Sequence, residues 1–252
     1  MNQTTSFDQL LEWTVSNGYD PRLFQTWIPS KHFVTGYFQN SSITAIRGGD
    51  EIYALAIGSD PLVTAELDSF SIARVAKEKY QTFYQPRHEW DAYAVSSSEF
   101  KKPVDLIEST SNLIFEVISD SKEIDGFIDT HAPDSSVRSG NEEVISWVSI
   151  RQKDELLALA ALCQWQSGEI VLSSVGVHSG HRNKGLGKLI TAAATEIGLS
   201  KSKHVALGVL ASNTPAKKVY ESLGYTLLGE FAAFSRRDTN KFSLDENACC
   251  DY

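Results

Sequence analysis

The spacing of hydrophobic residues predicts alternating strands and helices in the C-terminal half of the chain. Between residues 186 and 197, apolar residues recur at i, i+3, i+4, i+7, i+8 and i+11, which forms one face of an amphipathic helix. Short apolar runs separated by polar turns predict strands. We expect strands at 113–117, 144–150, 156–164, 170–177, 204–210, 225–228 and 231–234, and further helices beginning at Asp120 and after Asn213.

The N-terminal half gives a weaker pattern. We expect a helix at 7–16, a hairpin with strands 43–46 and 52–57, a helix at 62–80 and a strand at 90–95. Taken together, the elements predict an α/β (α+β) protein with a mixed sheet.

A sequence echo connects the two halves. Residues 46–57 match residues 150–161 at seven of twelve positions, an offset of 104 residues. Either the first half is a degenerate copy of the second, or two hairpins rich in Ala and Leu resemble each other. The polar segment around Pro103 suits a boundary in both cases. We therefore expect an N-terminal α/β domain at 1–108, a second domain at 109–240 and a tail at 241–252.

The composition is that of a folded protein. Hydrophobic residues make up 42% of the chain and charged residues 22%. No apolar run approaches the roughly 20 residues of a membrane span, and no signal peptide is visible, so we expect a cytoplasmic protein without a membrane partner. Cys163, Cys249 and Cys250 match no zinc or disulfide spacing, so we expect no metal.

Charge is unevenly distributed along the chain. The net charge of −9 argues against a nucleic-acid partner. The segment 182–218 nevertheless holds seven basic residues and one acidic residue, which gives it a charge of +6 and leaves −15 for the rest. This basic segment indicates either a phosphate-bearing ligand or solvated helix faces.

The loop before the amphipathic helix carries the most informative motif. It contains Gly185 and Gly187, where the backbone can approach a ligand closely, and the first N–H groups of the helix are free to bind phosphate. Ile190 occupies the third glycine position of a dinucleotide fingerprint, and the spacing around Lys188 excludes a nucleoside-triphosphate P-loop. The remaining pattern is R-x-x-G-x-G, which begins at Arg182.

A second motif, N-x-x-A-x-x-x-Y-x-x-x-G-Y, covers residues 213–225. In this order and spacing, the two motifs resemble the GNAT superfamily of acyl-coenzyme-A-dependent N-acyltransferases, over about 113–235. The resemblance implies a mostly antiparallel sheet flanked by helices, acetyl-CoA as co-substrate and an amine acceptor, attacked in a ternary complex. The acidic remainder of the chain is compatible with a cationic amine.

The resemblance also implies residue roles. A splayed strand end would bind the pantetheine arm, the loop would wrap the pyrophosphate, and Tyr220 would be the general acid that protonates the leaving thiolate. Considered without the resemblance, Tyr220 is equally compatible with the buried apolar face of a helix, and Asn213 with a helix N-cap. The cofactor-binding residues would be Val175, Gly176, Val177, Arg182, Asn183, Lys184, Gly185, Leu186, Gly187, Lys188 and Asn213.

The general base is left open by the sequence. Glu169 begins the strand that splays and is a weak candidate, whereas Ser173 and Ser174 lie nearer but are not strong bases. The backbone N–H of Val177 is the expected oxyanion donor. Cys163 is disfavoured as a nucleophile because it lies on a predicted buried strand. Two alternative functions remain, a non-catalytic acyl-CoA sensor and an acyltransferase acting on a protein N-terminus or lysine.

Overall fold

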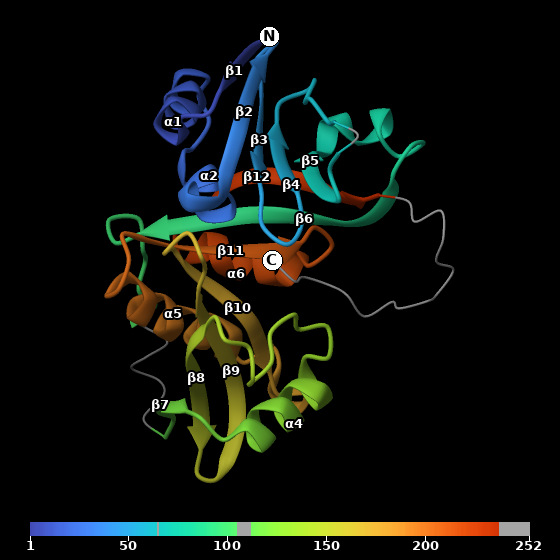
Figure 1. Ribbon diagram of the computed structural model, residues 1–252. Coiled ribbons are helices and arrows are strands. Elements are labelled where there is room, and N and C mark those ends of the chain that lie inside the picture. Colours follow the sequence, from blue (N-terminus) through green and yellow to red (C-terminus); the bar gives the residue numbers. More distant parts are fainter. Residues whose placement is uncertain (65, 105–111, 237–252) are drawn as a thin grey trace.

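The computed structural model describes residues 1–64, 66–104 and 112–236, and it is built on one twelve-stranded sheet (Figure 1). Within these ranges no helix has the length and apolar content needed to cross a bilayer. The strands are β1 (Asn2–Thr4), β2 (Phe33–Gln39), β3 (Ser42–Arg47), β4 (Tyr53–Ile57), β5 (Ser69–Ala73), β6 (Gln85–Ser96), β7 (Ile114–Ile118), β8 (Val144–Gln152), β9 (Glu155–Gln164), β10 (Ile170–Val177), β11 (His204–Leu210) and β12 (Thr226–Ser235). The helices are α1 (Phe7–Ser16), α2 (Arg22–Trp27), α4 (Ser121–His131), α5 (Leu186–Leu199) and α6 (Thr214–Ser222), with the 3-10 turns η1 (Ser30–His32), η2 (Arg74–Lys79) and η3 (Ser179–His181).

The sheet has the same arrangement when it is followed inward from either edge. From one edge, β7, β8, β9 and β10 are antiparallel neighbours and β10 is parallel to β11. From the other edge, β1, β2, β3 and β4 are antiparallel neighbours and β4 is parallel to β5. At the centre the halves exchange strands, because β6 lies between β11 and β12 while β12 lies between β5 and β6 (Figure 1).

This topology changes how the sequence echo is interpreted. By position in the sheet, β3 and β4 correspond to β9 and β10. The twelve-residue echo instead aligns β3 and β4 with β8 and β9, one strand out of step. The echo therefore reflects two hairpins of similar composition, and the relation between the halves rests on strand order and direction. The expected boundary at 108 and the tail at 241–252, with Cys249 and Cys250, lie outside the described residues.

The predicted elements of the C-terminal half are confirmed. Asp120 caps α4 by accepting a hydrogen bond from the Glu123 amide at 3.0 Å. The two short strands expected after residue 224 form one strand, β12, with a register shift between Leu227 and Gly229. Helices α5 and α6 cover one face of this half of the sheet and α4 covers the other.

The helix expected at 62–80 is wrong. The described part of this segment contains β5 followed by the 3-10 turn η2. Phe70 and Ile72 are fully buried, and β5 is paired on both sides, with β4 and β12. A strand buried on both faces reads as a continuous apolar run, which short-range periodicity does not separate from a buried helix. Strand β2 was not predicted either, whereas α1 and the β3–β4 hairpin are confirmed.

Candidate functional site

A gap between two parallel strands opens beside the glycine loop. Strands β10 and β11 are paired only through Ile170 with Val205 and Val171 with Ala206, so the rest of β10 has no partner on that side among the described residues. The register of β10 on β9 shifts between Ser173 and Gly176, which marks a bulge. Backbone groups along this edge are therefore available to an extended ligand.

The bulge has two local causes. Ser174 has a left-handed φ of 48°, and its hydroxyl donates to the Val137 carbonyl at 3.1 Å and accepts from the Val137 amide at 3.2 Å. Gly176 is tightly packed, since a Cβ there would lie 3.1 Å from Ala132 Cβ and 3.2 Å from Phe127 Cε1, and these neighbours would have to move by a few tenths of an ångström. The strand end is thus held by the loop after α4 and by α4 itself.

The loop after β10 ends in a left-handed turn at the start of α5. Asn183 has φ 61° and Gly185, the N-cap residue, has φ 80°, with no side chain capping the helix. A Cβ at Gly187 would lie 3.7 Å from Val177 Cγ2, an ordinary contact, so packing does not demand a glycine there. The first N–H groups of this helix have no side-chain cap, and N–H groups in that position are of the kind that bind phosphate.

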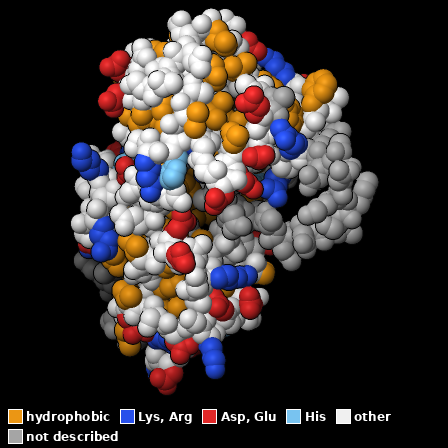
Figure 2. All heavy atoms as spheres, in the orientation of Figure 1, with side chains coloured by type: hydrophobic (Ala, Val, Ile, Leu, Met, Phe, Trp, Pro, Cys, Tyr) orange, Lys and Arg blue, Asp and Glu red, His pale blue; other side chains and the backbone are white. Residues whose placement is uncertain are grey.

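The basic segment is divided by the fold. The Arg182 guanidinium donates to the His131 carbonyl at 2.8 Å and ties the loop to α4. Lys217 pairs with buried Asp91 at 2.9 Å and is not available for a ligand phosphate. Lys184 and Lys188 have no ion pair among the described residues, so they supply the positive charge beside the start of α5. Figure 2 shows acidic and basic side chains interspersed over one face of the molecule, without a single continuous acidic region.

Tyr220 lies on α6 and is 7% exposed. Its ring packs between those of Tyr93 and Tyr225, with centroids 6.3 and 5.8 Å away. Tyr93 donates to Glu221 at 3.1 Å, and the Tyr225 hydroxyl is 2.7 Å from Thr195 Oγ1. The Tyr220 hydroxyl has no hydrogen-bond partner in the described part of the chain, and burial raises the pKa of its phenol to about 12. It is therefore a protonated donor at neutral pH.

Asn213 caps α6, which was the structural alternative to a role in binding the cofactor. Its side-chain oxygen accepts from the Ala216 amide at 3.2 Å. The two N–H donors of the amide remain for other partners.

Glu169 lies away from the splayed strand end. It accepts a hydrogen bond from Ser202 at 3.0 Å and lies 3.3 Å from His204 Nε2. Six residues of strand separate it from Val175, or roughly 20 Å. This position does not support a role as general base. Cys163 is fully buried on β9, and burial raises the pKa of its thiol to about 11, so it is not an activated nucleophile.

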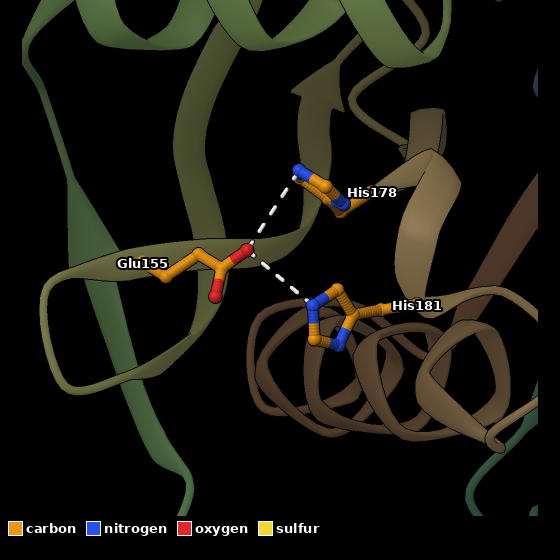
Figure 3. Close-up of side chains that lie close together, drawn as sticks. All are labelled: Glu155, His178 and His181. Carbon is orange, nitrogen blue, oxygen red and sulfur yellow. Dashed lines mark ion pairs between the residues drawn. The ribbon is translucent and has the colours of Figure 1, made fainter.

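A cluster of two histidines and a glutamate, which sequence reasoning missed, lies beside the loop (Figure 3). Glu155 Oε1 is 3.3 Å from His181 Nε2 and 3.8 Å from His178 Nε2. One possible ligand atom from each residue lies within 4.8 Å of the others, so the three could hold a metal ion. However, His178 Nδ1 accepts the Gly180 amide at 3.1 Å, so a neutral ring carries its hydrogen on Nε2, which faces the carboxylate. The only sequence signal was the H-x-x-H spacing, because the β8–β9 hairpin brings in Glu155.

Comparisons with known proteins bear on this geometry. The model of the acetyltransferase (GNAT) family matches residues 108–225. A search of curated proteins found no match. Among solved structures, the chain is similar to a GCN5-related N-acetyltransferase from Kribbella flavida, with 16% identity, a TM-score of 0.54, and coverage of 81% of this chain and 89% of that one. It is also similar to a GCN5-related N-acetyltransferase-like protein from Streptococcus suis, with 13% identity, a TM-score of 0.52, and coverage of 92% and 100%. These likenesses show the fold, and they extend across both halves.

Proposed function

We propose that this chain, whose residues 108–225 are a domain of the GNAT acetyltransferase family, transfers an acetyl group from acetyl-CoA to a primary amine. One observation carries this proposal. The unpaired edge of β10 leads through a short loop directly to the uncapped N-terminus of α5. A ligand with an extended arm followed by a pyrophosphate matches that sequence of sites.

The cofactor would lie along this path. The backbone from Val175 to Val177 would bind the pantetheine arm, and amides from Asn183 to Lys188 would bind the pyrophosphate. The ammonium groups of Lys184 and Lys188 would add charge, and Arg182 would hold the loop in place through its bond to α4. The free N–H donors of Asn213 would face the arm.

The chemistry would be direct attack of the neutral amine on the thioester carbonyl. Across β9, the His178 amide donates to the Leu157 carbonyl at 2.8 Å. Amides alternate in direction along a strand, so the neighbouring Val177 N–H points toward the gap, where it could stabilise the oxyanion. Tyr220 would donate its proton to the leaving thiolate. No side chain is assigned as the base, and the rate should rise with pH as the acceptor amine loses its proton.

Calorimetry and a thiol-release assay test this function. We expect acetyl-CoA to bind with a Kd in the micromolar range and at least one amine of a panel of polyamines, amino sugars, amino acids and lysine peptides to release coenzyme A. Binding without release for any amine would favour the alternative, a non-catalytic acyl-CoA sensor. Release with peptides alone would favour a protein acyltransferase. Absence of binding would refute both the enzyme and the sensor. The cytoplasmic location stays a prediction from the sequence.

A further inference from the structure

The N-terminal half reaches the candidate site through strand β6. This strand is paired with β11 over seven residue pairs, from Ser96 with His204 to Trp90 with Leu210. Two of its side chains contact α6, the helix that carries Tyr220. The first 104 residues therefore contribute directly to the surroundings of a residue in the other half.

The stronger of the two contacts is an ion pair. Asp91 is 2% exposed, and its Oδ2 accepts a hydrogen bond from Lys217 Nζ at 2.9 Å. Lys217 also donates to the Ala211 carbonyl at 2.8 Å, just before α6 begins. Arg74, from the turn η2, pairs with the other carboxylate oxygen of Asp91. Removing one member would leave buried charges without a partner, so this network resists rearrangement.

The second contact lies one turn further along α6. The Tyr93 hydroxyl donates to Glu221 Oε1 at 3.1 Å, and its ring packs against that of Tyr220. Lys217 and Glu221 therefore stand at i−3 and i+1 from Tyr220, and both are held by alternate residues of the same strand. Two contacts one helical turn apart fix the rotation of a short helix about its axis.

We propose that Asp91 is a positioning residue for acyl transfer, and that its ion pair with Lys217 holds α6 in the rotation that presents the Tyr220 hydroxyl to the thioester sulfur. This inference rests on the proposed function. It gives the N-terminal half, which carries no R-x-x-G-x-G loop in its sequence, a part in the reaction without a cofactor site of its own.

The first test is a mutant cycle on the full chain. Asp91→Asn should lower kcat about tenfold and change KM for acetyl-CoA less than twofold. In the Tyr220→Phe background, Asp91→Asn should lower kcat no further, because there is no hydroxyl left to position. If both variants lower kcat independently, so that their effects multiply, Asp91 is merely structural and the proposal fails. Glu230→Gln is the matched control: it also removes a carboxylate bonded to Arg74, but no hydrogen bond or ion pair joins Glu230 to α6 within the described residues, so kcat should stay within twofold.

The second test does not depend on turnover. In Asp91→Asn, amide hydrogen exchange in α6 should quicken at least tenfold while exchange in α5 stays unchanged. Lys217→Met, which keeps the aliphatic stem, should give the same result if Asp91→Asn folds poorly. Unchanged exchange in α6 of both variants would overturn the inference even if the wild type is an active acetyltransferase. Faster exchange in the variants, combined with a wild-type protein that shows no turnover, would instead refute the proposed function and leave intact the inference that Asp91 and Lys217 hold α6 in place.

Discussion

Removal of one buried hydroxyl should separate catalysis from stability. Tyr220 and Tyr225 lie side by side, with ring centroids 5.8 Å apart. Of the two hydroxyls, only that of Tyr225 has a hydrogen-bond partner among the described residues, Thr195 Oγ1 at 2.7 Å. Tyr220→Phe and Tyr225→Phe thus delete the same atom from neighbouring rings, and only the second breaks a hydrogen bond within the described residues.

The two substitutions should have opposite effects: Tyr220→Phe should lower kcat with little change in stability, and Tyr225→Phe should lower stability with little change in kcat. Tyr220→Phe should change the free energy of unfolding by less than about 0.5 kcal/mol, since no hydrogen bond is lost. It should lower kcat about 100-fold, a loss of about 2.7 kcal/mol in transition-state stabilisation. We take the low end of the range for general acids because a phenol whose pKa burial raises to about 12 donates its proton reluctantly to a thiolate. Tyr225→Phe should cost about 1 kcal/mol of stability and leave kcat within about threefold.

Urea unfolding and thiol release under saturating acetyl-CoA provide the two measurements. Calorimetry on both variants is the control, because acetyl-CoA affinity should be unchanged when a hydroxyl outside the phosphate loop is removed. Equal kcat for wild type and Tyr220→Phe would refute the general-acid role. A stability loss in Tyr220→Phe as large as that in Tyr225→Phe would show that the hydroxyl has a structural partner. The wild-type rate should also show no decline between about pH 8 and 10 from ionisation of Tyr220, since a raised pKa keeps the phenol protonated there.

Three further predictions concern glycines and one carboxylate. Gly187→Ala should stabilise the fold by about 0.5 kcal/mol, because its Cβ meets only an ordinary contact at 3.7 Å, yet raise the calorimetric Kd for acetyl-CoA about tenfold by obstructing the backbone. Gly224→Ala should cost about 3 kcal/mol in urea unfolding, because φ is +92° and the Cβ would lie 2.1 Å from the Glu99 carbonyl oxygen. Burial opposes ionisation of the Glu99 side chain, but hydrogen bonds from Arg22 and Ser96 outweigh it and lower its pKa to about 2. Its contribution to stability is therefore complete above about pH 4.5 and lost as the pH falls toward 2, so Glu99→Gln should flatten the pH dependence of urea midpoints in that window; an unchanged slope would contradict this.

Local signals made the C-terminal half predictable. The periodic stripe of α5, the Asp120 cap and the Asn213 cap each lie within a few residues of the backbone that they organise. The glycine loop belongs to the same class, since Gly185 takes a left-handed conformation that its own lack of a side chain permits. Such features are encoded over one or two turns of chain, so a single sequence reveals them.

Features that depend on pairing between distant segments could not be predicted from the sequence. β5 is a strand because β4 and β12 both pair with it, and β12 is more than 150 residues away, as the Arg74–Glu230 ion pair with its separation of 156 shows. Glu155 joins two histidines only because the β8–β9 hairpin places it there. The hydrophobic pattern of residues 62–80 does not indicate that β4 and β12 pair with this segment. Tertiary pairing therefore overrode a helical pattern.

The exchange of β6 and β12 explains why the Asp91 network lies where the halves meet. Each central strand is bordered by a strand from the other half, so side chains from both halves face one another in a buried layer. A carboxylate as buried as Asp91 is costly unless cations neutralise it, and its two cations, Arg74 and Lys217, come from different halves of the chain. Lys217 lies 126 residues from Asp91, so in the sequence it is one more charge in a basic segment. In the folded chain it ties the N-terminal half to the helix that carries Tyr220, which is why substitution of Asp91 should alter the proposed acyl transfer.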